Sequence, residues 1–214
     1  MSKQFLAILA AIVIIFGGLL IFNKHEAKAP TQDGNKQTAT LTQHKIEGST
    51  GVVLTEYGDF QCPSCGQYYP LLKELKAKYA GKVTFQFRHF PLVEIHQNAL
   101  VAARNAEAAA MQNKFWEMHD LLFENQSAWS SSTNPTPVFE GYAEKLGLDM
   151  AKFREDVKSP KTNDIVQADR AEAQRLGYQS TPTFEINGQK IENPTSIEGF
   201  STLLDEAIKQ KQNQ

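Results

Sequence analysis

The pattern of apolar and polar positions divides the chain into three parts. Residues 5–22 are an uninterrupted stretch of Ala, Ile, Leu, Val, Phe and Gly without a charge. As a helix this stretch would be about 27 Å long, close to the roughly 30 Å hydrocarbon core of a bilayer, and we expect residues 1–23 to form a membrane anchor. A cleaved signal is the alternative, since Ala27-Lys28-Ala29 supplies small residues for cleavage. Residues 24–48 are polar and predict a flexible tether.

Strand and helix signals follow each other from residue 49 to about residue 210. The apolar, β-branched run 51–57 predicts a buried strand. Pro63 suits the first turn of a helix, which apolar residues at helical spacing continue as far as Gly81. Residues 82–90 alternate apolar and polar positions and predict a second strand. Strand, helix and strand form a βαβ unit, which is right-handed by default.

A long helical stretch separates this unit from a second set of strands. Residues 94–177 are almost wholly helical in pattern, with one break at the Ser, Thr, Asn and Pro cluster 130–137. Strand signals return at 183–186 and 189–191, joined by Asn-Gly, a strong hairpin signal. Ser196 can cap a closing helix. The order βαβ, helical insert, ββα predicts an α/β fold.

Composition and charge narrow the class of protein. With 41% apolar and 21% charged residues, the 214-residue chain has an ordinary globular composition. A folded part of about 170 residues buries roughly 70% of its unfolded surface, so it needs no disulfide for stability and its cysteines are free for chemistry. The net charge is -2 and no basic stripe interleaves with aromatic residues, so we expect no nucleic acid partner.

The chain has two cysteines, in the motif Cys62-Pro63-Ser64-Cys65. A structural zinc site needs two further ligands, but no other cysteine exists and the histidines are scattered along the chain, so we expect no metal here. A purely structural disulfide between residues three apart constrains little of the unfolded chain. A metal-binding module using both cysteines and a histidine, and a fold serving only as a binding scaffold, are the alternatives to a redox centre.

The position of the motif at a helix start gives its two cysteines different roles. The unsatisfied N–H groups of a first helical turn stabilise a thiolate, so we expect Cys62 to be the exposed nucleophile. Cys65 lies one turn further on, faces inward and serves as the resolving thiol. Pro63 and Ser64 tune the reduction potential between them, although neither adds a charge.

The order of these motifs resembles the DsbA-like branch of thioredoxin-fold thiol-disulfide oxidoreductases. The resemblance covers residues 48–210 and includes Ser180-Thr181-Pro182-Thr183-Phe184 before the hairpin, while residues 113–123 look like the insert helix of that family. It implies a thioredoxin fold, with a central mixed sheet flanked by helices and an all-helical insertion. It also implies a cis Thr181–Pro182 peptide beside the disulfide, with the Thr181 backbone pairing with an extended substrate segment.

Two further positions gain meaning from the resemblance. Glu56 matches the buried acidic residue beneath the active site, which would exchange a proton with Cys65; the alternative is a side chain that reaches solvent at the sheet end. Ser64 departs from the family, because strongly oxidising members carry a histidine there. The strength of oxidation is therefore left to measurement.

Other aromatic and histidine side chains carry weaker signals. The aromatic and leucine residues of 115–123 are expected to form the core of the insert. His89 is either a packed or solvated strand-end residue or a group near the site. Tyr57, Phe60 and Tyr68 flank the motif and could offer an apolar surface to unfolded substrates.

These expectations combine into one function. The protein is expected to be an exported, membrane-tethered enzyme that introduces disulfides into reduced proteins through Cys62 and Cys65, with no other cofactor, and that is reoxidised by a membrane or small-molecule partner. Counting lysines around residues 5–22 leans against export, but single N-terminal spans resemble uncleaved export signals and the cysteine pair suits an oxidising compartment. A reductase or isomerase would use the same residues.

Overall fold

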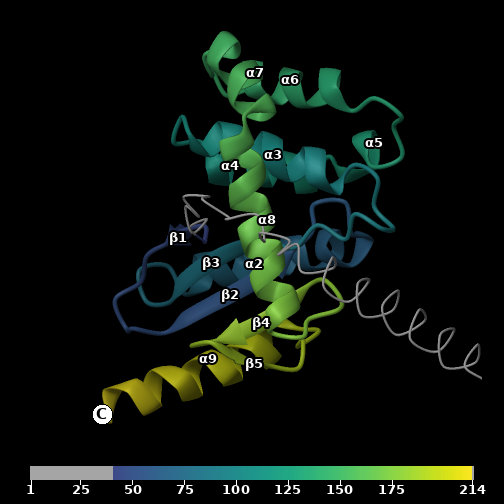
Figure 1. Cartoon of the computed structure of the whole chain (residues 1–214). Coiled ribbons are helices and arrows are strands. Elements are labelled where there is room, and N and C mark those ends of the chain that lie inside the picture. The colour runs from purple at the N-terminus through teal and green to yellow at the C-terminus, as the bar shows by residue number, and fades with distance from the viewer. Residues whose placement is uncertain (1–40, 214) are drawn as a thin grey trace, which may run out of the picture. The chain divides into compact units, whose positions relative to one another are not determined.

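The computed structural model describes residues 41–213, which form a five-stranded mixed sheet with helices on both faces (Figure 1). The strand order is β1-β3-β2-β4-β5, for β1 (His44–Ile46), β2 (Val53–Gly58), β3 (Thr84–His89), β4 (Thr183–Ile186) and β5 (Gln189–Lys190). Strands β2 and β3 are parallel, and the other pairs are antiparallel. The expected thioredoxin fold is confirmed.

The parallel pair is connected by helix α2 (Pro63–Lys78), as the sequence pattern predicted. The hairpin of β4 and β5 is also confirmed: Asn187 and Gly188 both have positive φ, at 52° and 79°. Two positive φ values in a two-residue loop match the twist of a hairpin, which Asn-Gly permits without strain. Ser196 caps α9 (Ile197–Gln212), accepting a hydrogen bond from the Gly199 N–H at 3.2 Å.

The side chains on the two faces of β2 meet different helices. Leu54 packs in a cluster with Leu72 and Leu75 of α2 and with Phe200 and Leu204 of α9. Tyr57, which points to the opposite face, packs near Ala173 of α8 (Pro160–Arg175). Alternation along a strand places neighbouring residues on opposite faces, so Glu56 shares the α2 face with Leu54.

The helical insert consists of α3 (Ala99–Ala110), α4 (Phe115–Glu124), α5 (Gln126–Trp129), α6 (Thr136–Lys145), α7 (Met150–Lys158) and α8. Figure 1 shows α8 running from the other insert helices down past the sheet. The expected core role of residues 115–123 is confirmed, because Phe115, Leu122 and Phe123 are buried in one cluster with alanines of α3. The single-turn α5 has no separate signal in the sequence pattern.

The predicted tether is wrong at its C-terminal end. His44–Ile46 form β1, which pairs with β3, and Thr42 donates to both carboxylate oxygens of Asp169 in α8. Gly48 passes so close to the start of β3 that a Cβ there would lie 2.3 Å from the Val83 carbonyl carbon. This segment is held by polar contacts rather than by apolar burial, which is why a hydropathy pattern does not reveal it.

No helix within residues 41–213 is long and apolar enough to cross a membrane. The anchor predicted at residues 5–22 and most of the predicted tether lie outside the described residues.

Candidate active site

The two cysteines lie at the N-terminus of α2. Cys62 is the N-cap residue with extended backbone, φ −65° and ψ 121°, and Pro63 occupies the first turn. The Cys62 N–H donates to the Asp59 carbonyl at 3.1 Å, and the Gly66 N–H donates to the Cys62 carbonyl at 3.1 Å. Both cysteines are free thiols. The helix start therefore places its unsatisfied N–H groups beside Cys62.

Cys62 is more covered than the sequence predicted, whereas Cys65 faces inward as expected. Cys62 is 7% exposed and Cys65 is fully buried, so the expectation of an exposed nucleophile is wrong in degree although the order of exposure is as expected. The Cys62 thiol lies 3.4 Å from the Thr181 carbonyl, to which it donates. Gln126 of α5 covers the same turn, donating to the Cys62 carbonyl at 2.9 Å. A Cβ at Gly66 would lie 2.6 Å from the Gln126 Oε1, so glycine makes this approach possible.

The environment separates the pKa values of the two thiols. A hydrogen bond from Cys65 outweighs burial and, with contributions from Thr181 and from the N–H groups of Cys65 and Ser64, lowers the pKa of Cys62 to about 5. Burial raises the pKa of Cys65 well above its usual value, and the Cys62 and Glu56 charges add to this. Cys62 is thus a thiolate at neutral pH and Cys65 a thiol.

The loop before β4 forms the wall beside Cys62. The Thr181–Pro182 peptide is cis, as the family resemblance implied, and both residues are buried. The Pro182 carbonyl accepts a hydrogen bond from the Asn193 side chain at 2.7 Å. Within residues 41–213 the buried Thr181 hydroxyl has no partner in the thiol form, and it contributes to the lowered pKa of Cys62 once the thiolate forms.

Glu56 lies beneath the cysteine pair, on the α2 face of β2. It is 7% exposed, so the alternative of a solvent-reaching side chain is excluded, and its Oε1 has no partner among the described residues. Burial raises its pKa to about 7; the Lys76 ammonium opposes this and Cys62 adds to it. A cavity of about 10 Å³ lies between Glu56, Lys76 and Trp116. The Lys76 ammonium lies 4.4 Å from the centre of the Trp116 ring.

Comparison with known proteins places this geometry in a family. Residues 47–206 match the family model described as thioredoxin. The chain belongs to the thioredoxin family. A thioredoxin-like oxidoreductase from Silicibacter pomeroyi is 26% identical, with a TM-score of 0.63 over 76% of this chain and 88% of that one. Bacillus subtilis BdbD is 21% identical, with a TM-score of 0.68 over 77% and 92% of the two chains.

The same fold is found in α-DsbA1 of Wolbachia pipientis, which is 20% identical with a TM-score of 0.69 over 83% of this chain and 98% of that one. Curated relatives include the Na(+)/H(+) antiporter NhaA 3 of Salinispora tropica, 39% identical over 153 residues. That match covers 72% of this chain but 22% of the relative, so the chain spans less than a quarter of that protein's length.

Three contributors to this thioredoxin-family site escaped sequence analysis. Lys76, Gln126 and Asp59 reach the site from α2, α5 and the turn before Cys62. Asp59 accepts hydrogen bonds from the Gln61 N–H at 2.8 Å, the Leu92 N–H at 2.9 Å and His96 Nδ1 at 2.6 Å, and so fixes the turn. The position of Asp59 three residues before Cys62 is the only sequence signal among them.

Two weaker expectations are resolved by burial. Tyr57 and Phe60 are 3% and 1% exposed, so these two residues offer no apolar surface to substrates, and Phe60 instead packs on Phe87 and Phe123; Tyr68 is only partly buried. His89 is fully buried and hydrogen-bonded to Glu107 at 2.7 Å, which is the packed interpretation. Among residues 41–213, the group of three possible metal ligands with converging atoms contains neither cysteine.

Proposed function

We propose that this thioredoxin-family oxidoreductase is a thiol oxidase, which passes the Cys62–Cys65 disulfide to reduced proteins. The observation that carries the direction is the lowered pKa of Cys62, about 5. A stabilised thiolate favours the reduced enzyme and so makes its disulfide a stronger oxidant. The value lies between the pKa of about 7 of thioredoxin and that of about 3.5 of the strongly oxidising DsbA.

The exchange proceeds in two displacements. A substrate thiolate attacks the Cys62 sulfur, the Cys62–Cys65 bond breaks, and a mixed disulfide forms. Cys65 leaves with the electron pair, and because its pKa is raised it takes a proton, which Glu56 supplies. A second substrate thiolate then attacks the substrate sulfur and releases Cys62 as a thiolate. The substrate loses two electrons, and the cysteine pair gains them.

The residues around the pair have assigned parts in this proposal. The Thr181 and Pro182 loop, whose backbone contacts the Cys62 sulfur, pairs with an extended substrate segment. Pro63 begins the helix that stabilises the thiolate, and the Ser64 N–H adds a hydrogen bond to it. A membrane or small-molecule oxidant restores the disulfide, and no other cofactor is needed.

The reduction potential of the Cys62–Cys65 pair distinguishes an oxidase from a reductase. Equilibration with glutathione is expected to give a value between about −270 mV, typical of thioredoxin, and about −120 mV, typical of DsbA. A value at or below that of thioredoxin would favour the reductase alternative. The Cys62→Ser variant is expected to lose disulfide transfer to reduced test proteins, whereas Cys65→Ser is expected to accumulate mixed disulfides through Cys62. Undiminished transfer by Cys62→Ser would show that the fold is only a scaffold.

The location of the enzyme is part of the same proposal. Residues 5–22 anchor the chain in the cell membrane with the catalytic domain outside the cytoplasm, where reduced proteins fold and oxidants are available. Protease added outside intact cells is expected to release the domain. Full protection would place the domain inside, and an N-terminus of the mature protein beyond residue 29 would show cleavage instead of anchoring.

A further inference from the structure

Three side chains from separate elements converge at the edge of the sheet: His44 of β1, His89 of β3 and Glu107 of α3. The Nε2 atoms of His44 and His89 lie 2.5 and 2.7 Å from the same carboxylate oxygen, Oε1 of Glu107. All three possible ligand atoms lie within 4.8 Å of one another. The residues are 63 and 18 positions apart from Glu107 in sequence, so the fold alone brings them together.

We propose that His44, His89 and Glu107 form a site for a divalent transition-metal ion such as Zn²⁺, with water in the fourth position. Two imidazole nitrogens and one carboxylate are ligands that zinc accepts at about 2.0–2.2 Å. A tetrahedral arrangement at those lengths separates ligand atoms by roughly 3.3–3.5 Å. Each N···O pair in the structure has to open by less than about 1 Å to reach that spacing.

The surroundings hold two ligands rigidly and leave the third accessible. The side chains of His89 and Glu107 are 1% and 4% exposed, whereas that of His44 is 14% exposed. The His44 ring stacks on Phe115, with ring centres 3.5 Å apart and an interplanar angle of 5°, which fixes its orientation. Because β1 is an edge strand, an ion can enter on the His44 side and β1 can make the small adjustment that coordination needs.

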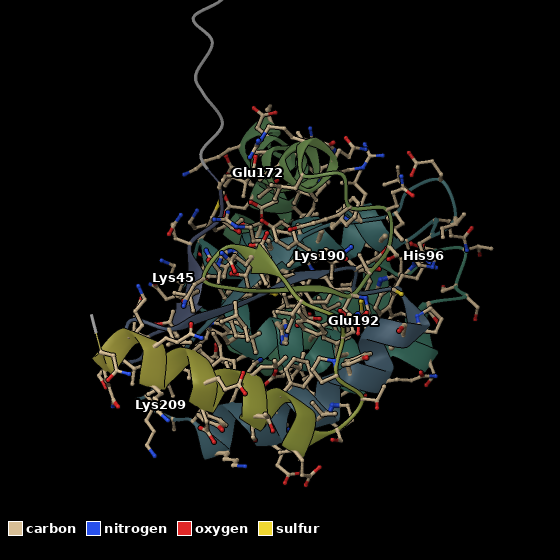
Figure 2. All side chains as sticks on the ribbon, turned by 90° about the horizontal axis from the view of Figure 1, so that it is seen from below. Lys45, His96, Glu172, Lys190, Glu192 and Lys209 are labelled. Carbon is tan, nitrogen blue, oxygen red and sulfur yellow. The ribbon has the colours of Figure 1, made fainter. Side chains whose placement is uncertain are left out.

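The His44 end of the site lies on β1, at the edge of the sheet. Figure 2 shows Lys45, the neighbour of His44 in β1, on the opposite side of the molecule from His96, whose ring bonds to Asp59 of the active-site turn. Metal at this position therefore joins β1 to β3 and α3, and it acts on the stability of the N-terminal edge of the domain.

The surroundings of His89 Nδ1 indicate how tightly the metal ion should bind. Its buried Nδ1 has no hydrogen-bond partner within residues 41–213. Coordination through Nε2 leaves the ring hydrogen on Nδ1, where metal-binding histidines ordinarily donate to an oxygen. Loss of such a partner lowers metal affinity by about 10–100-fold, so we expect weaker binding than at a fully supported zinc site.

The test uses the full-length chain with Cys62 and Cys65 oxidised, so that neither thiol binds metal. Co²⁺ is expected to bind one ion per chain with the visible absorption of a tetrahedral site, and Zn²⁺ to displace it. Free Zn²⁺ at a hundredfold excess over Kd is expected to raise Tm by about 5–10 °C. In nitrogen-15 spectra of the unmodified protein, Zn²⁺ is expected to shift Nε2 of His44 and His89; unchanged imidazole signals would overturn the proposal.

Variants at two of the three residues test whether Zn²⁺ binds at this site. His44→Ala and Glu107→Gln are expected to abolish the Zn²⁺-dependent rise in Tm, each compared with its own metal-free form. His96→Asn is the matched control, because His96 also bonds to a buried carboxylate but belongs to no group of three ligands among residues 41–213, and it is expected to keep the full response. A response that persists in both His44→Ala and Glu107→Gln, or its absence from the unmodified chain, would show the trio to be a hydrogen-bonded structural contact only.

Discussion

Two buried carboxylates, Glu56 under the cysteine pair and Glu107 at the junction of β1, β3 and α3, sit in opposite electrostatic situations. They are 7% and 3% exposed, so desolvation disfavours the charge on both. Glu56 has an oxygen without a partner, and its pKa rises to about 7. Burial also raises the pKa of Glu107, but hydrogen bonds from His44 and His89 outweigh it and lower the pKa to about 2.

The difference shows that partners, rather than burial, decide whether a buried acid holds its charge. Glu107 is a settled anion whose hydrogen bonds join three elements. Glu56 is a poorly supported acid beside two thiols, able to carry or release a proton near neutral pH. Glu107 stabilises the domain, whereas Glu56 lowers its stability near neutral pH and is available for proton transfer.

The largest effect is expected from removing Glu107. Glu107→Ala leaves the buried His89 and the partly buried His44 without their shared acceptor and should lower the free energy of unfolding by about 3–5 kcal/mol. Glu107→Gln keeps an acceptor oxygen without the charge, and about 1–3 kcal/mol is expected. Urea denaturation in the presence of a chelator measures both. Glu107→Gln as stable as the parent would show that the two histidines do not depend on the carboxylate charge.

Glu56 is expected to give the opposite result. Between its unfolded pKa of 4.5 and its folded pKa of about 7, the folded state keeps a proton that the unfolded state has lost, so stability falls as pH rises through this window. The loss is about 3 kcal/mol, and Glu56→Gln removes it. The variant should therefore be more stable than the parent above pH 7 and no more stable near pH 4.5.

Urea denaturation of the disulfide form at several pH values measures this difference without interference from the Cys62 thiol. Equal pH dependence in Glu56→Gln and in the parent would contradict the raised pKa. Glu56→Gln should also slow the release of Cys65 as leaving group, because the proton donor is gone.

The features around Glu56 and the cysteine pair that depend on periodicity or on local motifs could be predicted from the sequence. Alternating apolar residues predicted β2 and β3, the Cys-Pro-Ser-Cys motif marked the start of α2, and the family resemblance supplied Glu56 and the cis peptide before Pro182. Each signal lies within a few neighbouring residues or within a known motif order.

The remaining features depend on contacts between distant residues. His44 and Glu107 are 63 positions apart, and Cys62 and Thr181 are 119 positions apart. Short polar β1 carries no hydropathy signal, and the pKa of Cys62 is lowered by groups outside the dipeptide between the cysteines as well as by the Ser64 N–H. The contacts of β1 and the pKa of Cys62 therefore depend on the assembled fold and cannot be derived from neighbouring residues in the sequence.

The smallest effect is expected at Lys76, the cation that partly offsets the isolation of Glu56. Its ammonium lowers the pKa of Glu56, so Lys76→Met should raise that pKa further above its value of about 7. Carbon-13 NMR of the Glu56 carboxyl in the disulfide form measures the shift. Lys73→Met is the matched control on the same helix, because the Lys73 ammonium pairs with Glu124 at 2.8 Å on the surface and does not act on Glu56. Equal shifts in both variants would mean that the overall charge of α2, rather than the Lys76 ammonium over the Trp116 ring, sets the proton affinity beneath the cysteines.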